Sequence, residues 1–301
     1  MTRMLTGTAV ALMSALAVTL GYGREGGQNA GAGRKGVASP RTPTIEQVTP
    51  GLYAIRLPNP GPTVVVRVTG EGVILVDDMN EAQYDPIIAL VKTVTPQPVK
   101  YVISTHHHAD HTGGNVKFLE HAQILMHKNA RAAMVGATPL PGRPPITYTT
   151  EAAVHLGGAE VQLHHVGRGH TNGDTIVYFP DLRIMAAGDL FFMIDRGPVI
   201  DYANGGTAVG WLSMIDNILK FDFDTVIPGH GPVSRRADLV HFKERFATLQ
   251  ARTRTLIRQG VGKDQYLTKL EVGDLGWSLD PSSNFVRMTA SGFYDELANA
   301  R

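Results

Sequence analysis

Short apolar runs rich in β-branched residues, bounded by Pro, Gly and polar positions, recur along the chain and are typical of β-strands. Three such stretches come early, separated by Pro and Gly, at Gly51–Leu57, Thr63–Thr69 and Gly72–Val76. Six further strands are expected along the chain, at Lys100–Ser104, Ile124–His127, Glu160–Val166, Asp174–Phe179, Arg183–Ala187 and Thr225–Ile227.

Helices are indicated where apolar residues recur every three to four positions. One is expected after Gly72–Val76, with Asp85 as its N-cap and Pro86 in its first turn. Others are expected at Lys128–Val135, around Trp211–Leu219, around Leu239–Leu249 and, less regularly, on to Arg301. Strands and helices alternate, with several hairpin-like strand pairs, so we expect an α/β protein whose sheets are covered by helices.

The N-terminal residues have a different pattern. Arg3 precedes an uncharged apolar run, Leu5–Leu20, which is short for a membrane span of about 20 residues but suits a secretory signal peptide. From Gly21 to Thr44 the chain is rich in Gly, Ala, Arg and Pro and cannot bury enough apolar surface to order itself. We therefore expect a signal peptide at 1–20, a flexible tether at 21–44 and a single domain at 45–301, in the periplasm or secreted. An uncleaved membrane anchor is the alternative.

Composition restricts the partners. The net charge is +1 and the basic residues are scattered, so no nucleic-acid-binding face is indicated. A small-molecule substrate is expected, with no membrane contact after signal cleavage, and no feature sets the oligomeric state. The absence of Cys excludes disulfides, thiolate metal ligands and a cysteine nucleophile. No G-x-S-x-G motif is present either, so a serine nucleophile of that kind is not expected.

The segment Thr105–Gly114 contains the pattern H-x-H-x-D-H directly after a predicted strand. If the backbone stays extended, His106 and His108 point to one side and His107 to the other, as a bystander. Buried imidazoles and carboxylates at this density need partners. A divalent metal satisfies several of them together, and zinc accepts both His nitrogen and Asp oxygen.

Three further segments place potential ligands after predicted strands and beside glycine, which lets the backbone approach a crowded centre. They are G-R-G-H-T-N-G-D at Gly167–Asp174, which contains His170, A-G-D-L at Ala187–Leu190, which contains Asp189, and P-G-H-G-P at Pro228–Pro232, which contains His230. His164 and His165 lie within a predicted strand and are expected to be structural.

These four motifs, in this order, resemble the metal motifs of the metallo-β-lactamase superfamily, and the resemblance covers roughly Gly51 to Pro232. The resemblance implies an αββα sandwich, here with a helical C-terminal extension, and two zinc ions at one edge of the sheets. It also implies that Asp77 orients ligands from behind the site. Asp110 is the expected catalytic residue as well as a ligand. The implied ligands are His106, His108 and His170 for the first metal, Asp110, His111 and His230 for the second, and Asp189 as the bridge.

Two metals about 3.5–4 Å apart activate a water and stabilise the charge that develops on a carbonyl oxygen, so hydrolysis is expected. His108 argues against the flavin-linked diiron relatives, which carry Glu at that position. Asp189 stands where several β-lactamases carry Cys or Ser, and Asp there is typical of thioesterases and lactonases. Export nevertheless favours a β-lactam as the leading substrate. The loop Ala137–Thr150 and the segment Phe191–Tyr202 are expected to shape the pocket.

Three hypotheses therefore stand: an exported zinc hydrolase of strained carbonyls such as β-lactams, a lactonase or thioesterase-type hydrolase, and a non-catalytic accessory metal protein of a periplasmic quinoprotein system. Occupancy of all seven motif positions favours catalysis, because a scaffold needs no open coordination site.

Overall fold

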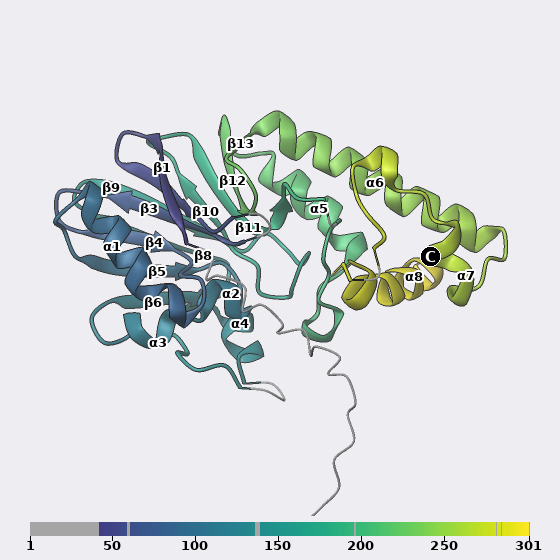
Figure 1. Ribbon diagram of the computed structural model, residues 1–301, viewed down its shortest axis with the longest axis horizontal. Coiled ribbons are helices and arrows are strands. Elements are labelled where there is room, and N and C mark those ends of the chain that lie inside the picture. Colours follow the sequence, from purple (N-terminus) through teal and green to yellow (C-terminus); the bar gives the residue numbers. More distant parts are fainter. Residues whose placement is uncertain are drawn as a thin grey trace, which may run out of the picture. The chain divides into compact units, whose positions relative to one another are not determined.

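The strands of this computed structural model form two sheets (Figure 1), and the structure describes residues 42–58, 61–135, 139–195, 197–280, 282–283 and 285–300. The first sheet has its strands in chain order: β1 (Thr44–Thr49), β2 (Leu52–Arg56), β3 (Thr63–Val68), β4 (Val73–Val76), β5 (Val99–Ser104), β6 (Gln123–His127) and β7 (Ile146–Tyr148). The second runs in the order β13 (Ser234–Arg235), β12 (Thr225–His230), β11 (Ile184–Phe192), β10 (Ile176–Phe179), β9 (Ala159–His164) and β8 (Glu151–Leu156).

The two sheets pack face to face through apolar inner faces, and their central strands are apolar on the outer faces as well. In β3, Val65 points into the core between the sheets, and its neighbour Val64 points to the outer face. In β10, Val177 points inward and Ile176 outward. Strands buried on both faces read as nearly continuous apolar runs and need covering elements on each outer face.

Helices supply this cover. On the first sheet α1 (Tyr84–Val94) buries Ile87 and Val91 against the outer face, with α3 (Asn115–Phe118) beside it. The second sheet is covered by α5 (Ala208–Ile218) and α6 (Arg236–Arg258). Short helices α2 (Ala109–Thr112) and α4 (Lys128–Ala133) follow β5 and β6. The layers run helix, sheet, sheet, helix, as expected of an αββα sandwich.

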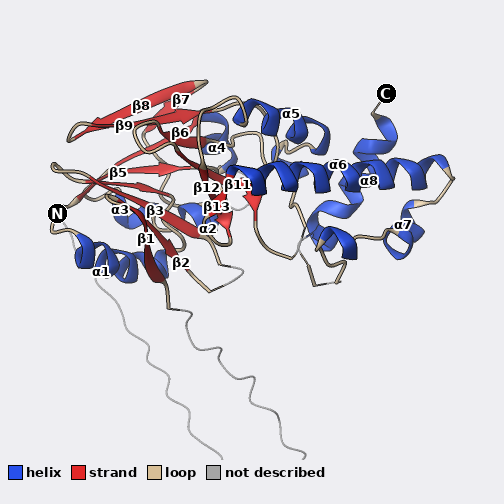
Figure 2. Ribbon diagram, turned by 90° about the horizontal axis from the view of Figure 1, so that it is seen from above, coloured by secondary structure: helices blue, strands red, loops and turns tan. Residues whose placement is uncertain are grey.

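The C-terminal region is helical, also as expected. After α6 come α7 (Lys263–Lys269), a π-helical turn η4 (Phe285–Thr289) and α8 (Ala290–Asn299), which gather with α6 beyond the second sheet (Figure 2). Phe293 and Leu297 of α8 are buried in the same core as α5 and α6. Among the residues that the structure describes, no helix has the length and apolar character that crossing a bilayer requires.

Several element boundaries differ from the sequence expectations. Strands β1, β7, β8 and β13 were not predicted, and β7 lies inside the loop predicted at Ala137–Thr150. Their patterns are short and partly exposed, so pairing with neighbours decides them more than periodicity does. Helix α1 begins one residue before Asp85, with Gln83 as its N-cap. The signal peptide and the tether as far as residue 41 lie outside the described residues, and β1 already begins at Thr44.

Candidate metal centre

The seven predicted ligands meet where β5, β11 and β12 end. His106, His108, Asp110 and His111 follow β5 and enter α2, and His230 is the last residue of β12. Asp189 lies in the C-terminal half of β11, and His170 comes from the loop between β9 and β10. Strands β11 and β12 are parallel neighbours, so their C-terminal halves lie side by side.

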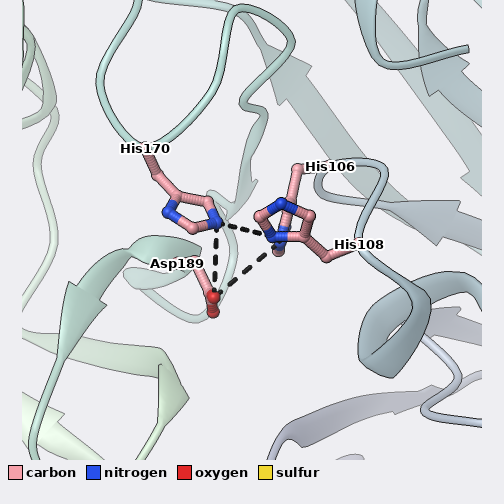
Figure 3. A group of neighbouring side chains, drawn as sticks. All are labelled: His106, His108, His170 and Asp189. Atoms are coloured by element: carbon pink, nitrogen blue, oxygen red, sulfur yellow. Dashed lines mark hydrogen bonds and ion pairs between the residues drawn. The ribbon is translucent and has the colours of Figure 1, made fainter. Parts of the chain in front are cut away.

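The first group comprises His106, His108, His170 and Asp189, whose donor atoms converge in Figure 3. Nδ1 of His108 is 3.1 Å from Nε2 of His106 and 2.9 Å from Nε2 of His170. Oδ2 of Asp189 is 3.8 Å from Nε2 of His106 and 3.5 Å from Nε2 of His170. Tetrahedral zinc with ligands at 2.0–2.1 Å separates its ligand atoms by about 3.3 Å. The observed spacing is therefore that of four ligands around one such ion.

The second group comprises Asp110, His111 and His230. Nε2 of His111 is 3.3 Å from Nε2 of His230, and Oδ2 of Asp110 is 3.8 Å and 3.5 Å from these two nitrogens. Oδ1 of Asp189 lies 3.2 Å from His111 Nε2 and 3.4 Å from His230 Nε2. Each carboxylate oxygen of Asp189 thus faces a different group of ligands.

Buried polar atoms test whether a metal fits here. Oδ1 of Asp189 is buried and has no hydrogen-bond partner, although two imidazoles approach it. A Cβ on Gly229 would lie 2.0 Å from this oxygen, so glycine at that position leaves room for it. A buried carboxylate oxygen without a hydrogen bond is costly. A metal ion bound by this oxygen would remove the cost, and the donor set of imidazole and carboxylate groups fits zinc.

Hydrogen bonds at the far side of each ring determine which nitrogen faces the metal groups. Nδ1 of His170 donates to the carbonyl oxygen of Val199 (2.7 Å), and Nε2 of His108 donates to Oδ2 of Asp201 (3.0 Å). Nδ1 of His111 donates to Oδ2 of Asp77 (2.8 Å). In each ring the remaining nitrogen is the one that faces the other ligands, as in carboxylate–histidine–metal arrangements.

Asp77 occupies the position behind the site that the sequence suggested. Its φ of 61° lies in the left-handed region, which costs a non-glycine residue about 1–3 kcal/mol. Three hydrogen bonds hold it there, from the Thr105 backbone N–H (2.7 Å), from Thr105 Oγ1 (2.8 Å) and from His111. Because Thr105 Oγ1 donates to Asp77, it accepts from Nδ1 of His106 at 3.0 Å. Asp77 therefore orients His111 directly and His106 through Thr105.

The loop that carries His170 is organised by Asp174. This buried carboxylate accepts hydrogen bonds from the backbone N–H groups of Gly169 (3.2 Å) and Thr171 (2.9 Å), on either side of His170. His165 donates through Nδ1 to the Asp174 carbonyl and stacks on His127 at 4.0 Å. His165 therefore has the structural role that was expected of it.

The two ligand groups differ in their affinity for protons. Burial lowers the pKa of His106 well below its usual value and, together with the neighbouring His108, lowers the pKa of His170 to about 4. For His111, burial also favours the neutral form, but the carboxylates of Asp189, Asp110 and Asp77 outweigh it and raise its pKa well above 6.5. Burial is likewise outweighed by Asp189 at His230, whose pKa is raised.

The order of metal loss in acid follows from these shifts. A protonated imidazole must lose its proton before it binds a metal, so affinity falls about tenfold per pH unit for each proton displaced. His111 and His230 are protonated at higher pH than His106 and His170, so the second group should lose its metal first. We expect zinc content to fall from two ions per chain to one as dialysis is taken from about pH 7.5 to about pH 5.5. Simultaneous loss of both ions would contradict this order.

A cavity of about 340 Å³ opens onto both ligand groups. Its polar side includes His108, Asp110, His170, Asp189 and His230, and its apolar side is formed by Phe192, Ile194, Val199 and Met288. The prediction that Phe191–Tyr202 shapes the pocket is therefore right. The loop at Ala137–Thr150 does not line it within the described residues 139–150. A larger cavity of about 640 Å³, between the start of α5 and the end of α8, contains none of the seven ligand candidates.

Sequence reasoning missed Asp201. This buried carboxylate contacts His108, and it lies 3.5 Å from Nε2 of His107, the residue expected to be a bystander. Burial would raise the pKa of Asp201, but hydrogen bonds from His107, His108 and Asn204 lower it below its usual range. These three residues, His107, His108 and Asp201, form a further cluster of potential ligands. Because Asp201 already accepts from His108 Nε2, we interpret the cluster as support for His108.

Comparison with known proteins gives the same assignment. The family model of the metallo-beta-lactamase superfamily matches residues 56–230. A metallo-beta-lactamase type 2 from Bacillus cereus is 31% identical over 184 residues, 59% of this chain and 70% of the relative. The alpha subunit of a 2,4-dinitroanisole O-demethylase from Nocardioides sp. is 30% identical over 137 residues, 44% of this chain and 41% of the relative. A solved metallo-beta-lactamase from Pontibacter korlensis has a TM-score of 0.62 at 20% identity, covering 68% of this chain and 99% of that one.

The matched segment, 56–230, ends on His230, the last of the seven candidate ligands. It contains both ligand groups and the strands that position them. The chain belongs to the metallo-beta-lactamase superfamily and is a metal-dependent hydrolase of the αββα fold.

Proposed function

We propose that this chain is an exported, zinc-dependent hydrolase that opens strained or activated carbonyls, with β-lactams as the leading substrate class. The observation that carries the proposal is the position of Asp189. Its two oxygens face separate ligand groups, 3.2 Å from His111 Nε2 and 3.5 Å from His170 Nε2. This arrangement suits two metals that share one carboxylate beside a substrate-sized cavity.

Zinc bound at the two groups would supply Lewis acidity and an activated water for attack on the carbonyl. The chain's own residues would orient this chemistry. Asp77, Asp201 and the Val199 carbonyl hold the imidazoles in single tautomers. Asp110, with 41% of its side chain exposed, lines the cavity with its Oδ2 3.5 Å from His230. We assign to the Asp110 carboxylate, besides ligation, the transfer to the leaving group of the proton that the attacking water gives up.

The substrate class follows from strain and pocket character. A strained ring needs less binding energy to reach its transition state than a relaxed amide does. The apolar side of the cavity, which includes Phe192, Ile194 and Met288, suits an apolar substituent beside the reacting carbonyl. The relative named as a β-lactamase supports β-lactams. The relative named as an O-demethylase subunit indicates that chains similar to this one also act on bonds other than the amide of a β-lactam.

Two alternatives differ in what they require of the site. A lactonase or thioesterase-type hydrolase would use the same residues, and the carboxylate at Asp189 favours it over a dedicated β-lactamase. An accessory metal protein needs a closed site. The cavity of about 340 Å³ that reaches Asp110 and His230 gives a substrate access and favours catalysis.

Steady-state assays of the zinc-loaded protein test the substrate. We expect measurable hydrolysis of at least one penicillin, cephalosporin or carbapenem, with comparable or slower turnover of a small lactone. Efficiency should stay below the diffusional ceiling of about 10⁸ M⁻¹s⁻¹. An Asp110→Ala variant controls for contaminating activity. Ready turnover of a thioester or phosphoester with no β-lactam opened would overturn the substrate class and leave the metal site intact.

Export is tested separately. The apolar run Leu5–Leu20 after Arg3 favours cleavage by a signal peptidase. In a Gram-negative host, the mature protein should be found in the periplasm with its N-terminus between Val18 and Glu25. A variant with Leu12 and Leu16 replaced by Arg should stay in the cytosol. N-terminal sequencing that finds Met1 on protein from the cytosolic fraction would refute export.

A further inference from the structure

The segment Val199–Tyr202 contacts two candidate ligands of the first metal group. Val199 accepts from Nδ1 of His170 through its carbonyl oxygen, and Asp201 accepts from Nε2 of His108 through Oδ2. The backbone N–H of Asp201 also donates to the carbonyl of His170 at 2.9 Å. The orientation of both imidazoles therefore depends on where residues 199–201 lie.

The residue between these two, Ile200, is held by the C-terminal region. Its backbone N–H donates to Oγ1 of Thr289 at 2.8 Å, and both residues are buried. Thr289 ends η4 and lies 59 positions after the last residue matched by the family model, residue 230. A side chain outside the matched region is thus bonded to the backbone that orients two candidate ligands.

The same face of the C-terminal helix holds the residues that follow. Thr289, Gly292 and Glu296 are spaced by three and four positions, so they lie on one face. Glu296 accepts from the Tyr202 hydroxyl at 2.9 Å and from the backbone N–H of Ala208, at the start of α5, at 2.7 Å. Gly292 lies against the Tyr202 ring, because a Cβ there would be 2.4 Å from Cδ2 of Tyr202.

These contacts form a continuous path from α8 to the first metal group. We propose that Thr289 is a positioning residue for the first metal: through Ile200 it fixes Val199 and Asp201, and through them His170 and His108. The inference rests on the proposed function in that it assumes a metal at His106, His108 and His170. The second group is oriented differently, since His111 is held by Asp77, and it should depend less on Thr289.

Thr289→Val removes the acceptor oxygen with little change in volume, and Thr289→Ser restores the oxygen. Thr253→Val is the matched control, because Thr253 is a fully buried threonine of the same helical region whose Oγ1 contacts Leu249 and Tyr266 and no ligand-holding residue. Changing a group that touches a ligand costs about 10–100-fold in metal affinity. For Thr289, one step further away, we expect about a 3–10-fold loss for one of the two zinc ions, by competition with a chromophoric chelator.

Nitrogen-15 NMR of the histidine side chains distinguishes a positioning role from a general loss of stability. A general loss of stability would affect the N–H protons of all the buried histidines alike. In Thr289→Val, the N–H protons of His170 Nδ1 and His108 Nε2 should exchange faster with solvent, while that of His111 Nδ1 stays as in the wild type. Thr289→Ser should restore the wild-type rates. Unchanged exchange and zinc affinity in Thr289→Val, with a loss of thermal stability like that of Thr253→Val, would overturn the proposal.

The experiment still tests the proposal if the wild-type protein binds no zinc or if Thr289→Val does not fold. If the wild-type protein binds no zinc, the proposed function fails, whereas exchange at His170 and His108 in the metal-free protein still tests the link to Thr289. If Thr289→Val does not fold, Tyr202→Phe removes the hydrogen bond to Glu296 and keeps the ring. This variant should then accelerate the exchange of the same two N–H protons with solvent, by less than Thr289→Val would. Unchanged exchange rates would count against the path.

Discussion

Replacing Asp189 by Ala is expected to lower turnover by about 10²–10³-fold and to reduce bound zinc from two ions per chain toward one. Asp189 would hold a metal that stabilises transition-state charge, and losses of that size are typical when such a stabilising group is removed. In this variant the first group still has three imidazoles, each with its tautomer fixed by a hydrogen bond. The second group has only two imidazoles and the partly exposed Asp110. The second metal should therefore be lost first.

Elemental analysis and steady-state assays of Asp189→Ala measure both effects. Asp274→Ala is the control, because Asp274 is an exposed carboxylate paired with Arg252 and lies outside both ligand groups. It should keep two metals and full activity. Two zinc ions bound to Asp189→Ala with wild-type affinity would remove Asp189 from the set of ligands.

Removal of zinc should lower the melting temperature by roughly 10 °C for each ion that is lost. The donors His106, His111, His170 and Asp189 are buried, and the folded chain holds them together before any metal arrives. A metal present at about 1,000 times its Kd stabilises the folded state by about 4 kcal/mol. In a domain of this size each kcal/mol shifts the melting temperature by about 2–4 °C.

Calorimetry with and without dipicolinic acid measures this shift, and added zinc should reverse it. A variant in which His106 and His111 are both replaced by Ala should show little response to either reagent, because each group loses a ligand. Identical melting temperatures for the wild-type protein with excess zinc and with the chelator would mean that the cluster binds no metal tightly.

The potential ligands could be predicted from the sequence because their information is local. His106, His108, Asp110 and His111 lie within six positions, and His170, Asp189 and His230 each follow a predicted strand beside glycine. That these positions converge was implied by the resemblance to a known family, because they follow strands of two different sheets. The longer strands and helices were predicted for a similar reason, since burial on one or two faces leaves a period in the residues themselves.

Asp201 could not be found in this way. It is separated from His108 by 93 residues and lies in the segment Phe191–Tyr202, which has no metal-ligand pattern. Its role depends on a loop conformation that Asn204 and Thr289 stabilise from different parts of the chain. His107 was assigned no contact because pleat direction indicates which way a side chain points and not which partner it meets there.

The sequence by itself indicated which residues could bind metal and that sheets would be covered by helices, because these depend on residue type, spacing and periodicity, whereas the sandwich of two sheets was implied by the family resemblance. The resemblance implied how the donors are divided into two groups, and the tertiary structure supplied the geometry of that division. The tertiary structure placed the two oxygens of Asp189 against different histidines, selected the ring nitrogens of His108 and His170 that face the other candidate ligands, and brought Met288 to the pocket. Each of these depends on atoms from distant segments meeting within a few ångströms, and only the packing of the whole domain specifies such distances.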